Sequence, residues 1–157
     1  MGGYILTYDE LLLEAHENNL KVKEVLLIAN KGLIHKDRIA IKKDLCSHKD
    51  KACVLAEELG HYYTTDGDIL DQTKPENVKQ EFKARIWSYN KMIGLIGIVN
   101  AFNAGCINYF EMAEYLDVTE EFLLEALNYY KSKYGLYTKL DNYILYFHPS
   151  LSVVKLF

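Results

Sequence analysis

The sequence has little of several features that would place it in a special structural class. Its 3 cysteines cannot all pair in a disulfide framework, and its 2 prolines are too few for a proline-rich linker. The longest apolar run, residues 92–99, is much shorter than the roughly 20 apolar residues that a membrane-spanning helix needs. Neither sign of charge dominates, because 18 Lys and Arg face 22 Asp and Glu. The net charge of −4 therefore excludes bulk electrostatic binding to nucleic acid or an anionic membrane.

What is present is the composition of a globular domain. The chain has 157 residues, of which 50% are hydrophobic and 25% charged, as in one ordinary domain or a small domain with an appendage. The first residues have no basic stretch before an apolar core, so we expect no signal peptide and a cytoplasmic, soluble protein. Cys46, Cys53 and Cys106 lack paired C-x-x-C spacing, which favours packing roles over a structural zinc site.

Hydrophobic periodicity predicts an α+β protein. We expect helices over residues 8–19, 47–63, 77–90, 92–104, 110–116 and 119–130. We expect strands over residues 21–28, 33–35 and 38–41, and a second hairpin over 136–140 and 143–147. A change of character near Gly105 predicts two domains, residues 1–104 and residues 105–157.

One motif carries chemistry, the segment Ala56-Glu57-Glu58-Leu59-Gly60-His61 on the second predicted helix. Residues four apart share a helix face, so Glu57 and His61 can bind one metal ion. The zincin motif H-E-x-x-H uses this spacing for two zinc ligands, with the intervening Glu as general base. Here Glu57 replaces the first His, and Glu58 is the candidate base. Gly60 permits close packing of the helix against a neighbour.

A third ligand and a substrate-binding strand are also expected. The next helix offers Glu81, and the loop carboxylates Asp66, Asp68 and Asp71 are alternatives. A zincin places a free strand edge beside its metal, where an extended peptide can pair, and residues 38–41 are our candidate. A di-metal site would require a second Glu-x-x-His helix, and the sequence contains no second copy.

These segments resemble the ImmA/IrrE-like metallopeptidases, in the branch of small proteins from prophages and mobile elements with E-E-L-G-H in place of H-E-x-x-H. The resemblance is strongest in VLAEELGHYYTT, residues 54–65. Upstream KGLI and RIAI match the family's hairpin, at residues 31–34 and 38–41. Downstream, residues 80–87 match its glutamate-bearing helix, and AEYLDVTEEFL matches its tail at residues 113–123.

The resemblance implies a zincin-like metalloprotease core and a cytoplasmic, zinc-dependent endopeptidase. It implies Glu57, His61 and Glu81 as metal ligands and Glu58 as catalytic base. Its expected substrate is a helix-turn-helix transcriptional repressor, whose cleavage derepresses a prophage or mobile element. The alternative is a non-catalytic zincin-like module that sequesters a regulator, with Glu57 marking a site that no longer supports hydrolysis.

The C-terminal segment resembles a helix-turn-helix pair followed by a hairpin, with Asp117 where the turn commonly has Gly. Residues 105–157 carry 7 acidic and 4 basic side chains, a net of −3, which argues against DNA contact. Eight of the 13 tyrosines also lie there, and we expect this part to bind protein rather than nucleic acid. Tyr62 and Tyr63 follow His61 and either line the cleft or pack. The remaining histidines have no partner at metal-binding spacing and are expected to be surface or packing residues, and His35, at the predicted hairpin, is the first of them to check for proximity to the site.

Overall fold

The computed structural model describes residues 5–65 and 75–157, which form a mixed α+β structure. The chain divides into two compact units. We call Leu6–Lys91 the N-terminal unit and the part from Met92 to Phe157 the C-terminal unit. The structure therefore divides between Lys91 and Met92, whereas the sequence predicts a boundary between residues 104 and 105. The helix that begins at Gly94 packs in the C-terminal unit, since the Cβ position of Gly97 lies 3.2 Å from Leu116 Cδ2.

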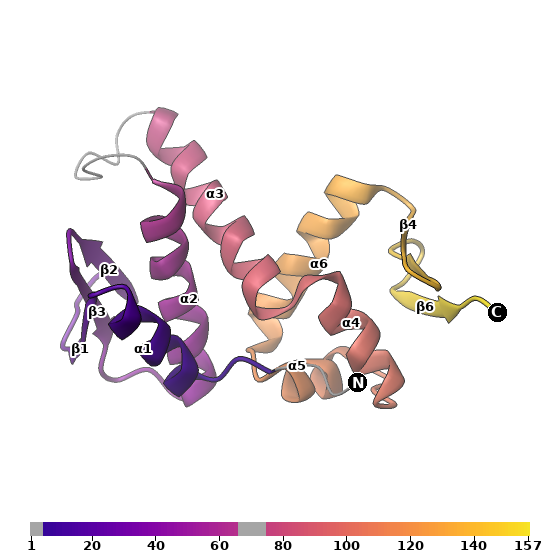
Figure 1. Cartoon of the computed structure of the whole chain (residues 1–157), viewed down its shortest axis with the longest axis horizontal. Helices are drawn as coiled ribbons and strands as arrows, with labels where there is room; N and C mark the ends of the chain where they lie inside the picture. The colour runs from indigo at the N-terminus through magenta and orange to yellow at the C-terminus, as the bar shows by residue number, and fades with distance from the viewer. Residues whose placement is uncertain (1–4, 66–74) are drawn as a thin grey trace. The chain divides into compact units, whose positions relative to one another are not determined.

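The N-terminal unit is a small sheet with helices beside it (Figure 1). In chain order its elements are α1 (Tyr8–Glu17), β1 (Lys21–Val25), β2 (Gly32–His35), β3 (Arg38–Lys42), α2 (His48–Thr64) and α3 (Pro75–Met92). The strand order is β1-β3-β2, with β1 parallel and β2 antiparallel to β3. α1 packs on β1 and α2, and α2 packs on β2 and β3. The core between these layers includes Leu11, Ile39, Ile41, Leu55 and Leu59.

Local sequence signals determine where these helices begin. The Thr7 side chain accepts a hydrogen bond from Glu10 N–H and Glu10 bonds back to Thr7, which makes a complete capping box for α1. Ser47 caps α2 in the same way by accepting from Asp50 N–H at 3.1 Å. Capping satisfies backbone donors that the first turn leaves without partners, so both helices start close to the predicted residues.

The sheet order overturns one expectation about the strands. Residues 38–41 were predicted to be the free edge beside the site, but they belong to β3, the central strand. The parallel pairing of β1 covers the side of β3 that the prediction left open. Among the residues that the structure describes, β1 and β2 are the edge strands of this sheet, and β2 is the one that α2 contacts alongside β3.

The C-terminal unit has three helices and a second small sheet (Figure 1). Its elements are α4 (Gly94–Asn103), α5 (Tyr109–Leu116), α6 (Glu120–Tyr134), β4 (Tyr137–Leu140), β5 (Tyr143–Tyr146) and β6 (Ser152–Lys155). Asp117 adopts the left-handed conformation between α5 and α6, at the predicted turn, and the Thr119 side chain caps α6. The predicted hairpin is present, and β6 adds a third strand that was not predicted.

Candidate metal centre

Helix α2 carries the motif residues on the side that faces the interior of the N-terminal unit. Glu58 and His61 are 8% and 7% exposed, which is unusual for ionisable side chains. Glu57, one turn before His61, is partly exposed. Such burial of charged groups is costly unless they are paired or bind a metal ion, and it therefore marks this face of α2 as a candidate site.

Gly60 brings α3 into contact with α2 at the level of the motif. A side-chain carbon at Gly60 would overlap the backbone carbonyl of Ala84 on α3, so only glycine allows this approach. The sequence prediction that Gly60 permits close packing is confirmed. Because the two backbones touch there, side chains one turn away on α3 reach the motif residues of α2.

Two polar contacts join the helices on either side of this glycine. His61 Nε2 lies 3.4 Å from Glu81 Oε1, and Arg85 Nε donates to Glu57 Oε1 at 3.2 Å. Glu57 and His61 are four residues apart on α2, and Glu81 and Arg85 are four residues apart on α3. Each pair therefore shares one helix face, so that Glu57 faces Arg85 while His61 faces Glu81. The Arg85 contact engages Oε1 of the Glu57 carboxylate.

The residues Glu57, His61 and Glu81 form a group that could hold a metal ion. Each offers one donor atom, and the three atoms lie within 4.8 Å of one another. Two carboxylate oxygens and one imidazole nitrogen are donors that divalent ions accept, and three protein ligands leave a position open for water or substrate. His61 Nδ1 is buried and has no hydrogen-bond partner within residues 5–65 and 75–157. Packing and the Glu81 contact therefore hold this ring.

Glu58 lies beside the three donors and against strand β2. Burial raises the pKa of Glu58 to about 8, and the neighbouring Glu57 and Glu81 carboxylates add to the rise. A hydrogen bond from the backbone N–H of Ile34 opposes it. Glu58 is thus a proton-accepting group whose environment, without a metal ion, favours the neutral form near neutral pH.

These groups open into a pocket of about 370 Å³. One wall consists of residues 29–34, from β2 and the segment before it. The other walls consist of Val54, Glu57, Glu58 and His61 from α2 and of Glu81 and Arg85 from α3. The metal-donor residues and the candidate base therefore line one pocket that is open to solvent.

The structure brings together all four residues of the predicted site, Glu57, Glu58, His61 and Glu81. The alternative ligands Asp66, Asp68 and Asp71 lie outside the described residues. His35 lies at the end of β2 but does not line the pocket. Sequence reasoning assigned no role to Arg85 or Gly32. The signal for Arg85 was its position four residues after Glu81, on the same helix face.

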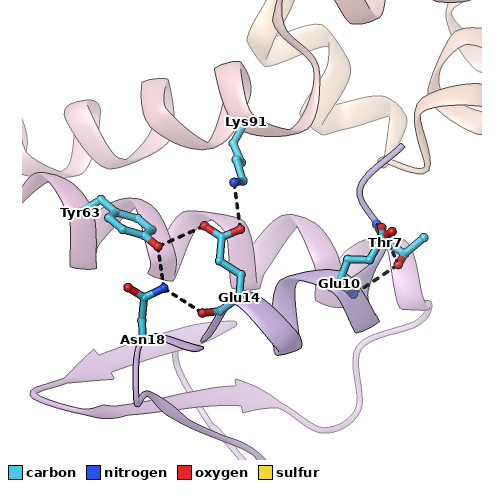
Figure 2. A network of polar contacts seen from close by, with 6 residues as sticks. All are labelled: Thr7, Glu10, Glu14, Asn18, Tyr63 and Lys91. Carbon is cyan, nitrogen blue, oxygen red and sulfur yellow. Dashed lines mark hydrogen bonds and ion pairs between the residues drawn. The ribbon is translucent and has the colours of Figure 1, made fainter. Parts of the chain in front are cut away.

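Tyr63 does not line the pocket and instead joins three helices (Figure 2). Its hydroxyl donates to Glu14 Oε1 at 3.1 Å and accepts from Asn18 Nδ2 at 2.9 Å, both on or next to α1. Lys91 Nζ from α3 lies 2.9 Å from Glu14 Oε2. The Tyr63 ring also stacks on Trp87 of α3, with centroids 4.9 Å apart. This network fixes α3 against α1 and α2, so the packing interpretation of Tyr63 holds.

Comparisons with known proteins give no family for this chain. No protein-family model, no curated protein and no solved structure matches it. Among the described residues no helix combines the length and the apolar character needed to cross a membrane. The chemistry of the site therefore has to be inferred from its own residues.

Proposed function

We propose that this chain is a zinc-dependent metalloendopeptidase with a zincin-like N-terminal unit, acting in the cytoplasm. The observation that carries the proposal is the convergence of Glu57, His61 and Glu81 next to the buried Glu58 in one open pocket. Two ligands one helical turn apart, a third on the adjacent helix and an acid beside them reproduce the functional groups of a metal-dependent hydrolase. The resemblance to ImmA/IrrE-like metallopeptidases agrees with this chemistry.

The protein's own residues would divide the reaction between them. Glu57, His61 and Glu81 would hold zinc, which supplies a Lewis acid and lowers the pKa of bound water. Glu58 would take the proton from the attacking water and later donate it to the nitrogen of the leaving peptide. The Arg85 contact with Glu57 offsets part of the negative charge that the first ligand adds.

The free edge of β2 supports a peptide as the substrate. Lys42 N–H donates to Lys31 C=O at 2.8 Å, and the register pairs Gly32 with Ile41. Hydrogen-bonded pairs alternate along antiparallel strands, so Leu33 and His35 bond to β3 while the backbone groups of Gly32 and Ile34 face away from β3. Gly32 and Ile34 also line the pocket, so an extended peptide can pair with the backbone groups of Gly32 and with the Ile34 C=O next to the metal donors, while the Ile34 N–H is engaged by Glu58.

We take the substrate to be a helix-turn-helix transcriptional repressor, as the resemblance implies, and its cleavage to derepress a prophage or mobile element. The acidic C-terminal unit, with a net charge of −3 over residues 105–157, favours a protein partner over DNA. It contributes α5 and α6, which are joined by a short turn with Asp117 in the left-handed conformation.

Metal content and repressor cleavage test the proposal together. Protein purified without a metal-affinity step should contain about one zinc per chain, and His61→Ala should lose it. On co-expression with the repressor encoded nearest to it, the wild type should generate cleavage fragments and Glu58→Gln should not. Glu17→Gln, an isosteric change at an exposed position of α1, is the matched control. Equal cleavage by wild type and Glu58→Gln would refute the mechanism.

A second candidate function is a non-catalytic module that binds and sequesters a regulator. The Glu57–Arg85 ion pair favours it, because a carboxylate already engaged by a guanidinium is a weaker metal ligand. Repressor binding that survives both chelator and Glu58→Gln, without fragments, would select this alternative.

A further inference from the structure

We propose that strand β2 positions the Glu58 carboxylate, with Gly32 as a positioning residue that leaves room for it and the Ile34 N–H as its anchor. The inference rests on the proposed function, because it concerns the base of that reaction. It assigns a role to Gly32, which belongs to no metal-binding motif. It also gives the outer edge of β2 a role in positioning Glu58, in addition to pairing with a substrate peptide.

The space around Gly32 is the first observation. A Cβ atom at this position would lie 2.6 Å from Glu58 Oε1, 3.0 Å from Glu58 Cγ and 2.6 Å from Val54 Cγ1. The backbone of Gly32 is not in the left-handed region, so its conformation alone would accept any residue. A side chain at this position would therefore have to displace Glu58 or Val54, so the space around the glycine, and not the strand conformation, is what constrains the position.

The backbone of Ile34 is the second observation. Its N–H faces away from β3, as the alternation of the β2–β3 ladder requires, and it donates to Glu58. Gly32 and Ile34 are two apart on β2 and thus face the same side of the strand. Glu58 consequently lies over the bare backbone at Gly32 while its carboxylate accepts from Ile34.

Held in this way, Glu58 is confined to the strand side of the pocket. A glutamate side chain that is free to rotate would populate several rotamers, and only some of them would place the carboxylate here. Displacement of a catalytic group by about 1 Å can lower a rate roughly 100-fold. A methyl group at position 32 should therefore lower the rate of the chemical step without removing a metal ligand.

Amide hydrogen exchange tests the position without reference to activity. In the metal-free full-length protein, the Ile34 amide should exchange at least tenfold more slowly in the wild type than in Glu58→Ala. The Leu33 amide, which bonds to β3, is the internal control and should be unchanged. Equal Ile34 exchange rates in the two proteins would overturn the proposal.

Kinetics on the purified repressor test the consequence. Gly32→Ala should lower kcat roughly 100-fold, with KM and zinc affinity within about twofold of the wild type. The double variant Gly32→Ala/Val54→Ala removes the overlap of the added methyl group with Val54 and retains its overlap with Glu58, so its kcat should remain low. The double variant is used in place of Gly32→Ala if the single variant does not fold. Recovery of kcat in the double variant would overturn the role of Gly32. A wild type that binds zinc and cleaves nothing would refute the proposed function, while the Ile34 exchange result would still decide the position of Glu58.

Discussion

At the residue scale, the site concentrates three carboxylates around one imidazole, and of these groups Glu58 and His61 are buried while Glu57 and Glu81 are partly exposed. Glu58 is 8% exposed and lies close enough to Glu57 and Glu81 for their charges to raise its pKa. Such an arrangement is unfavourable in the absence of a cation and is typical of functional sites rather than of structural ion pairs. A divalent ion would reverse the sign of the local potential.

The raised pKa of Glu58 predicts how stability depends on pH when metal is removed by chelator. The folded protein holds a proton on Glu58 up to about pH 8, whereas the unfolded chain releases it near the ordinary value of 4.5. Between these values the folded state binds more protons, so the free energy of unfolding should fall as pH rises, by roughly 3–5 kcal/mol in total. Urea unfolding from pH 4.5 to 8.5 measures this slope. Glu58→Gln should flatten it, and an unchanged slope in this variant would contradict the shift.

At the element scale, the ligands on α2 and α3 come together because the two helices make close backbone contact at Gly60. Gly60→Ala should therefore force the helices apart, lowering stability by about 1–3 kcal/mol and zinc affinity at least tenfold. Gly97→Ala is the matched control, a helical glycine whose added carbon would meet only side-chain atoms of Leu116 and Ile93. It should leave zinc affinity unchanged in calorimetric titration. Similar losses of affinity in both variants would show that the Gly60 contact is not what aligns the ligands.

The network around Tyr63 makes a second prediction about these elements. Tyr63→Phe removes a donor to Glu14 and an acceptor for Asn18 while it keeps the ring on Trp87. We expect a loss of about 1–2 kcal/mol in urea unfolding, the usual cost of two partly exposed hydrogen bonds. Tyr62→Phe, at the adjacent exposed tyrosine, should cost less than half as much. A larger loss for Tyr62→Phe would mean that the phenol of Tyr63 does not join the helices.

Sequence alone predicted those elements whose determinants are local. The helices begin close to the predicted residues because Thr7, Ser47 and Thr119 cap them locally, and the spacing of Glu57 and His61 placed them on one face of α2. The prediction that residues 38–41 form an edge was wrong, because the parallel pairing of β1 with β3 joins residues far apart in the chain. Arg85 and Gly32 were missed for the same reason, since their roles appear only when α3 and β2 lie against α2.

At the whole-molecule scale, the proposed metal centre belongs to one unit alone. Its ligands, its candidate base and all residues that line its pocket lie within Leu6–Lys91. The C-terminal unit has its own core, which includes the fully buried Tyr130, Leu123 and Leu145. A ligand that binds only the folded N-terminal unit stabilises that unit by mass action, by about 2.7 kcal/mol at a free concentration 100 times its dissociation constant.

Zinc should therefore shift one unfolding transition and leave another in place. Trp87, the single tryptophan, lies on α3 in the N-terminal unit and stacks on Tyr63, so its fluorescence follows that unit alone. Far-ultraviolet circular dichroism reports the helices of both units. In thermal melts, zinc should raise the midpoint seen by Trp87 by several degrees and split the dichroism curve into a shifted and an unshifted component. His61→Ala, which lacks a ligand, should show neither effect. A common shift of both signals would mean that the units unfold as one, and no shift of either would place zinc binding elsewhere or nowhere on this chain.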